Sequence, residues 1–207
     1  ADGLEKLSSD NDYFEKRVDF QLANSRVNYL RASLVNYWGK QSRNIQEEFE
    51  IWCSSQFWLE DHSIFMELKI QNNDLPWWEW PDKQAVRDKN ELANWKTNNQ
   101  RELLGHNLLQ WHLDRQWKSI RKLAKNLGII LFGDVPFYVS KDSADVWSNR
   151  SLFSILTNSD TFLQSGVPPD YFSETGQLWG NPVYRWSRHK ASKYRWWRKR
   201  ISRHLEQ

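Results

Sequence analysis

The sequence predicts an α/β protein whose first part is largely helical and whose second part holds one strand and its following helix. Apolar residues recur at helical spacing through most of residues 18–126. Ile129 to Phe132 then form a continuous apolar run behind Gly128, a pattern typical of a parallel strand that is buried on both faces. One parallel strand cannot make a sheet, so we expect either that the chain is a fragment of a larger fold or that this strand pairs with another chain.

The helices follow from the spacing of apolar residues and from the residues that stop it. Gly39 ends the first helix, Pro76 and Pro81 bracket a turn, and Gly105 interrupts or weakens the longest helix. A short helix is expected to begin at Asp61. The predicted helices cover residues 18–38, 45–59, 61–70, 90–126 and 187–205.

The charge is unevenly distributed along the chain. The formal net charge is +3, yet residues 185–203 carry nine Lys or Arg residues and no acid. Such a run with interleaved aromatics can mark a nucleic-acid site. At helical spacing, however, Tyr194, Trp197 and Ile201 share one face, which favours an amphipathic helix that packs on the fold. We therefore expect no nucleic-acid partner.

Several function classes are excluded by composition. No run approaches the ~18 apolar residues of a membrane span, and we expect no membrane partner. The one cysteine, Cys53, favours a reducing compartment, hence the cytoplasm, and is interpreted as a half-buried helix residue and not as a reactive thiol. The five histidines lack the spacing of a metal site, and we expect neither a metal nor another cofactor. The oligomeric state is left open.

Asp134 is the first candidate binding residue. In α/β proteins, ligands bind at the carboxyl ends of the strands, and Asp134 directly follows the apolar run. The alternative is that it only forms a turn at the strand end. Asp142 and Asp145 flank Ser143, and this group is better interpreted as the N-terminal cap of a short helix.

The stretch "GVPPDYFSETGQLWGNP", residues 166–182, is the second candidate. Its glycines and prolines fix a path that is too irregular for helix or strand. It nevertheless carries the large aromatics Tyr171, Phe172 and Trp179, whose flat faces suit sugar rings. Polar contacts to sugar hydroxyls would come from Asp170, Gln177 and Asn181. The alternative is that these aromatics only close the end of a barrel.

These stretches also carry a family resemblance. "GDVPFYVSKDSADVW", "GVPPDYFSETGQLWGNPVYRW", "WLEDHSIFMELK" and "PWWEWP" closely resemble the amylomaltases, the 4-α-glucanotransferases or disproportionating enzymes of glycoside hydrolase family 77. The resemblance extends over nearly the whole chain and implies part of a (β/α)8 TIM barrel. Residues 1–117 would be a helical subdomain inserted in the barrel. Residues 118–207 would be the barrel segment, with the third strand and its loop over 129–139 and a substrate-covering loop over 166–182.

The resemblance also implies site roles and a substrate, an α-1,4-glucan or malto-oligosaccharide. The family's matching Asp lies near the sugar at the cleaved bond, which points to Asp134. The matching aromatic pair lies at the tip of a loop over the glucan groove, which points to Tyr171 and Phe172. The matching Trp lines the sugar site, which points to Trp179. Asn181 completes the expected substrate-binding set.

Catalytic residues are expected to lie outside this chain. Family members transfer glucan by a retaining double displacement that needs an Asp nucleophile and a Glu acid/base about 5 Å apart. Their nucleophile lies in an Arg-x-Asp-His signature on the fourth strand, after the helix that corresponds to residues 187–205. We therefore assign no catalytic residue, and we expect the chain alone to be inactive in maltotriose disproportionation. The alternative is a non-catalytic glucan-binding module.

Overall fold

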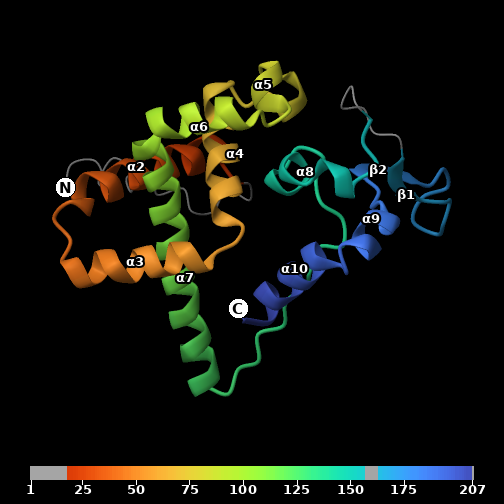
Figure 1. Cartoon of the computed structure of the whole chain (residues 1–207). Coiled ribbons are helices and arrows are strands. Elements are labelled where there is room, and N and C mark those ends of the chain that lie inside the picture. Colours follow the sequence, from red (N-terminus) through yellow and green to blue (C-terminus); the bar gives the residue numbers. More distant parts are fainter. Residues whose placement is uncertain (1–17, 157–162, 207) are drawn as a thin grey trace.

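The structure is a computed structural model that describes residues 18–156 and 163–206 (Figure 1). It is rich in helix and contains a small antiparallel sheet. The helices are α2 (Phe20–Trp38), α3 (Arg43–Ser55), α4 (Leu59–Gln71), α5 (Asp82–Ala85), α6 (Lys89–Asn98), α7 (Gln100–Asn126), α8 (Ala144–Ser148), α9 (Trp186–Ala191) and α10 (Arg195–Glu206), with 3-10 turns at Trp77–Glu79 and Arg150–Leu152. The strands are β1 (Gln164–Val167) and β2 (Gln177–Pro182).

The predicted early helices are confirmed to within a few residues. α2 begins after Asp19, whose carboxylate accepts a hydrogen bond from the backbone N–H of Leu22 at 2.9 Å. The long stretch over 90–126 divides at Asn99 and not near Gly105. Gly105 lies inside α7, where an added Cβ would be 2.7 Å from Cγ of Arg31 on α2. This glycine therefore allows the two helices to approach and does not interrupt α7.

Two apolar cores hold the molecule together. The first lies among α2, α3, α4 and α7 and contains Phe49, Trp52, Leu59, Leu108 and Trp111. The second joins α4, the 3-10 turn at Trp77–Glu79, α8 and the chain around α9 and α10. Its buried members include Trp77, Trp80, Trp147, Phe153 and Tyr184. The four largest of the fully buried side chains are Trp77, Trp111, Trp147 and Phe153, so part of the high tryptophan content serves packing.

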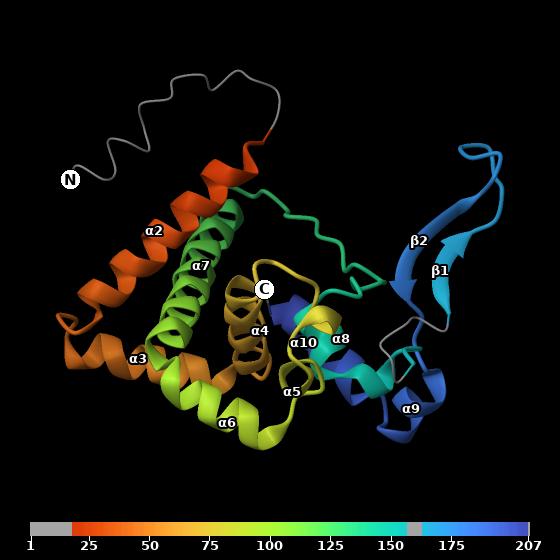
Figure 2. The ribbon, with the colours of Figure 1, turned by 90° about the horizontal axis from the view of Figure 1, so that it is seen from above.

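The strand expected over residues 129–132 is not formed. These residues run from the end of α7 toward α8 without regular structure, as Figure 2 shows. The side chains of Ile130 and Phe132 are 90% and 99% exposed. A strand is stabilised by hydrogen bonds to a neighbouring strand, and the described strands pair only with each other. The apolar run alone therefore leaves an extended, uncovered segment.

The stretch over 166–182 is not irregular, as the sequence suggested, but largely a β-hairpin. β1 and β2 pair antiparallel, with Gly166 opposite Leu178 and Val167 opposite Gln177. Gly166 permits this pairing because a Cβ there would be 2.4 Å from the carbonyl oxygen of Gln177. Gly176 closes the turn with φ of +74°, a conformation that glycine adopts without a steric penalty. The glycines that suggested irregularity thus make the hairpin possible.

The single helix predicted over 187–205 is broken in two. Lys193 and Tyr194 both have positive φ, 51° and 53°, and they separate α9 from α10. The packing prediction is confirmed for Trp197, which lies against the second core together with Trp196. Tyr194 and Ile201 remain half-exposed. After the break, several basic side chains of α10, among them Arg195 and Lys199, line a hollow that α4 and α8 also border.

Candidate functional site

The base of the β1–β2 hairpin brings together two of the predicted binding residues. Asn181 donates a hydrogen bond from Nδ2 to the backbone oxygen of Val139 at 3.0 Å. The Trp179 ring meets the Tyr138 ring edge-on, with centroids 6.0 Å apart. Trp179 Nε1 also donates to Gln177 Oε1 at 3.0 Å, and the side chain is 48% exposed. One indole is thus fixed in orientation with about half its surface open to solvent.

Behind Trp179 lies a set of aromatic rings that sequence reasoning missed. Tyr138 stacks on Tyr184 at an interplanar angle of 10°, with centroids 6.2 Å apart. The buried Tyr184 hydroxyl donates to the backbone oxygen of Phe137 at 2.5 Å. Burial raises the pKa of Tyr184 to about 12, so its hydroxyl remains a neutral donor. The sequence could have indicated Tyr138 as a site residue, because it lies four residues after Asp134 in the motif "GDVPFYVSKDSADVW".

The hairpin tip displays the other two aromatics. Tyr171 and Phe172 are 97% and 87% exposed, and their rings meet edge-to-face with centroids 5.6 Å apart. Asp170 Oδ1 stabilises the turn beneath them, because it accepts hydrogen bonds from the backbone N–H groups of Phe172 and Ser173, each at 2.9 Å. The structure therefore presents an exposed apolar pair on a fixed turn.

The acidic candidates separate into different environments. Asp134 is exposed in the extended segment before Tyr138, and its side chain forms no hydrogen bond or ion pair with another described residue. Asp142 instead forms an ion pair with Lys69 and accepts from the Trp77 backbone N–H at 3.3 Å. The N-cap prediction is confirmed at Ser143, whose hydroxyl accepts from the Val146 backbone N–H at 3.3 Å.

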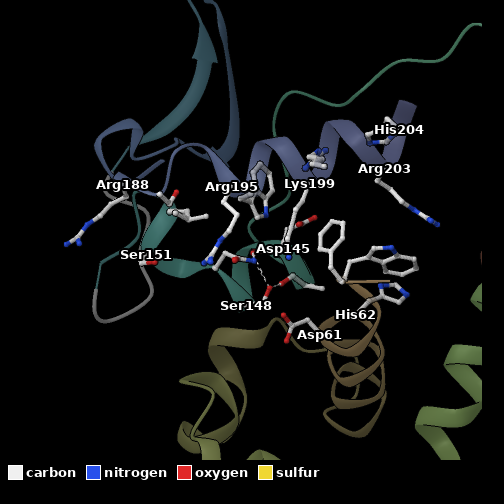
Figure 3. Close-up of a pocket in the computed structure, with 18 of the residues that line it drawn as sticks. Asp61, His62, Asp145, Ser148, Ser151, Arg188, Arg195, Lys199, Arg203 and His204 are labelled. Atoms are coloured by element: carbon white, nitrogen blue, oxygen red, sulfur yellow. Dashed lines mark hydrogen bonds between the residues drawn. The ribbon is translucent and has the colours of Figure 1, made fainter. Parts of the chain in front are cut away.

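A large cavity lies elsewhere, where α4, α8 and α10 meet (Figure 3). It has a volume of about 960 Å³ and is lined by basic, acidic and aromatic side chains. No predicted binding residue lines it. In the part of the chain that the structure describes, no group of three or more His, Cys, Asp or Glu residues is placed to hold a metal ion. No described helix is both long and apolar enough to span a membrane.

Comparison with known proteins decides the family. The model of glycoside hydrolase family 77, described as 4-alpha-glucanotransferase, matches residues 2–207. The chain belongs to this family. The 4-alpha-glucanotransferase of Synechocystis is 38% identical over 193 residues, which are 92% of this chain and 38% of that protein. The 4-alpha-glucanotransferase of Thermus thermophilus is 36% identical over 192 residues, again 92% of this chain and 38% of that protein.

A solved structure agrees with these relatives. The amylomaltase from Streptococcus agalactiae in complex with acarbose superposes with a TM-score of 0.84 at 31% identity. The match covers 99% of this chain and 43% of the amylomaltase. The chain thus spans about two fifths of the length of these family 77 proteins.

The cysteine of this family 77 chain behaves as the sequence indicated. Cys53 is half-buried within α3. Burial, with a contribution from nearby Glu50, raises its pKa to about 11, so the thiol is protonated at neutral pH. Because the thiolate is the reactive form, the raised pKa agrees with the prediction that Cys53 is not a reactive thiol.

His62 gives this family 77 chain a sensitivity to acid. Burial, together with the charge of His106, lowers the pKa of His62 from 6.5 to about 4. The unfolded chain therefore takes up this proton before the folded chain does. Stability should fall as the pH drops from 6.5 toward 4, by about 2–3 kcal/mol from this group.

The test is urea unfolding at pH 7.5 and pH 4.5, followed by far-UV circular dichroism. The variant His62→Gln should lose less stability between the two pH values than the unchanged chain. His204→Gln, a change at a more exposed histidine on α10, serves as the control. Equal losses for His62→Gln and the unchanged chain would contradict the assignment.

Proposed function

We propose that this chain forms a glucan-holding part of a 4-α-glucanotransferase, an enzyme that moves α-1,4-glucan segments to glucose or another glucan. The observation that carries the proposal is the exposed Trp179 face, held at the hairpin base by Asn181 and Tyr138 in a family 77 chain. The acarbose complex of the Streptococcus agalactiae amylomaltase supports an oligosaccharide as the substrate class.

Each candidate residue has a proposed role. The half-exposed indole of Trp179 offers an apolar face to a glucose ring. Asn181 positions that strand through Val139, and its amide oxygen can accept a hydrogen bond from a sugar hydroxyl. Tyr171 and Phe172 cover the glucan from the hairpin tip. The exposed carboxylate of Asp134 accepts hydrogen bonds from further hydroxyls.

The proposed reaction is a retaining transfer. An Asp nucleophile and a Glu acid/base about 5 Å apart would form and resolve a covalent glycosyl-enzyme. We assign neither role to a residue of this chain, so its contribution is to bind and orient the glucan. Orientation of this kind accounts for a large part of the catalytic effect of many enzymes. We infer also that residues 1–117 and 118–207 correspond to the inserted subdomain and the barrel segment.

The proposal can be tested in a chimera. The matched 192 residues of the Thermus thermophilus 4-alpha-glucanotransferase are replaced by the corresponding part of this chain. The chimera is expected to release glucose from maltotriose. Trp179→Ala should lower kcat/KM about tenfold, because an aromatic contact worth ~1.4 kcal/mol corresponds to a factor of ten. Glucose release is measured at several maltotriose concentrations.

The control variant is Tyr37→Ala, which removes an exposed aromatic from α2, outside the hairpin. It should leave kcat/KM unchanged. A folded chimera without activity, or equal activity for Trp179→Ala and the unchanged chimera, would count against the proposal.

The same variants distinguish the alternative, a non-catalytic glucan-binding module. This alternative is favoured by the fact that the hairpin base is anchored by contacts within the chain itself. It requires that the 207-residue chain alone binds maltoheptaose and that Trp179→Ala removes this binding. Calorimetric titration of both proteins with maltoheptaose measures it.

A further inference from the structure

The cavity among α4, α8 and α10 has an excess of positive charge. Its walls carry five cationic side chains and two carboxylates, Asp61 and Asp145. The cations come from α9 and α10: Arg188, Arg195, Lys199, Arg200 and Arg203. In Figure 3, Arg195 extends from α10 toward α8, whereas Arg188 points away from the centre. A hollow whose lining has a net positive charge concentrates anions.

The two carboxylates do not neutralise this excess. Asp61 forms an ion pair with Arg87 at 2.5 Å, and Arg87 lies outside the cavity lining. Asp145 lies beside Arg200 and accepts a hydrogen bond from Trp196. Burial raises the pKa of Asp145 and the charge of Asp61 adds to this rise, while the charge of Arg200 and the hydrogen bond from Trp196 act in the opposite direction.

Three cations of α10, Arg195, Lys199 and Arg200, lack some or all polar partners among the described residues, whereas Arg203 forms an ion pair with Asp114 at 3.6 Å. Arg200 donates from Nη2 to the backbone oxygen of Pro136 at 2.9 Å, but its buried Nε has no hydrogen-bond partner among the described residues. Lys199 lies 4.8 Å from the centre of the Phe57 ring and forms no ion pair with a described carboxylate. Arg195 likewise forms no ion pair there. Arg195 and Lys199 are four residues apart and therefore share one face of α10.

The remaining lining fits a larger ligand than a simple anion. The cavity volume of about 960 Å³ falls in the range of small-molecule sites. Phe57, Trp58 and Trp196 supply aromatic surface, while Ser148 and Ser151 supply hydroxyl groups. A sugar ring needs such a combination of apolar face and polar partners, and a phosphate group needs the cations.

We propose that this cavity binds the phosphate monoester of a hexose, with the phosphate held by cations of α10 that include Arg195 and Lys199. The sugar ring lies toward the aromatic and hydroxyl-bearing walls. This site is separate from the hairpin and does not depend on glucan transfer. A ligand bound there would contact α4, α8 and α10 at the same time. Residues of α4 and α8 also belong to the second core.

Calorimetric titration of the 207-residue chain with glucose 6-phosphate at low ionic strength tests the proposal. We expect a Kd below 1 mM and binding at least tenfold tighter than that of glucose or inorganic phosphate. The double variant Arg195→Gln/Lys199→Gln should weaken binding at least tenfold. Lys190→Gln, an exposed lysine on α9 outside the lining, should bind like the unchanged chain.

Three results would overturn the proposal. The first two are that glucose, or inorganic phosphate, binds as tightly as glucose 6-phosphate. The third is that the double variant binds glucose 6-phosphate as tightly as the unchanged chain. Circular dichroism checks that the double variant is folded. If it is not, the single variant Arg195→Gln and the salt dependence of binding by the unchanged chain decide, because an ionic site weakens as salt is added.

Discussion

Gly166→Ala is expected to reduce maltotriose disproportionation by the chimeric 4-α-glucanotransferase at least 100-fold. A Cβ at this position would lie 2.4 Å from the backbone oxygen of Gln177, and a backbone atom cannot yield without breaking the pairing of β1 with β2. Trp179 lies on β2 directly after the partner of Gly166. A displacement of about 1 Å in a positioning group can cost roughly 100-fold in rate.

The matched control is Gly39→Ala. Gly39 has φ of −64°, and a Cβ there would meet no atom within 4 Å. This variant should retain full activity, and both variants should show the helical circular dichroism of the unchanged chimera. If Gly166→Ala kept activity within twofold, the hairpin would not position the glucan.

Trp147→Ala is expected to lower the free energy of unfolding of the chain by about 3–5 kcal/mol, the usual range for a buried Trp or Phe truncation. Trp147 is fully buried on α8 and packs against Phe65 and Trp80. Its Nε1 donates to the backbone oxygen of Gln84 at 3.1 Å. The guanidinium carbon of Arg87 lies 4.1 Å from the centre of its ring.

Urea unfolding at pH 7.5, followed by circular dichroism, measures this loss. Trp147→Phe retains most of the apolar volume but removes the indole donor, so it should fall between Trp147→Ala and the unchanged chain. Trp117→Ala, at a half-exposed tryptophan of α7, should cost less than about 1 kcal/mol. Losses of similar size for Trp117→Ala and Trp147→Ala would show that Trp147 is not a centre of the second core.

The features that the sequence predicted well depend on neighbours along the chain. Helical spacing located α2, and the serine that precedes an acidic first turn located the cap of α8 at Ser143. The family motifs were specific because they are long and rich in tryptophan, proline and glycine. The match to the family model confirmed the family that they indicated.

The features that the sequence missed depend on contacts between distant residues. Gly166 suggested irregular backbone, yet its role is to admit the carbonyl of Gln177 from the opposite strand. Tyr184 supports Tyr138, 46 positions earlier, through ring stacking. The last helix breaks at Lys193 and Tyr194, where no glycine or proline in the sequence indicates the end of a helix. No local pattern contains such information.

The cavity was missed for a related reason. The sequence placed the run of basic residues over 185–203 on an amphipathic helix that packs on the fold, and it assigned these residues no ligand. The break before α10 directs several of these side chains toward α4 and α8, and there they line a hollow. Its opposite wall comes from residues more than 40 positions away, such as Asp145 and Asp61.

The uncovered segment over residues 129–132 has a practical consequence for handling the chain. Ile130 and Phe132 project into solvent, and the backbone from 130 to 132 forms no hydrogen bond with another described residue. Such a stretch has the composition and the unpaired backbone of an open sheet edge, which invites pairing between molecules. Solutions of the isolated chain should therefore lose material to aggregation as concentration rises, and a charged residue in place of Phe132 is the simplest way to slow it.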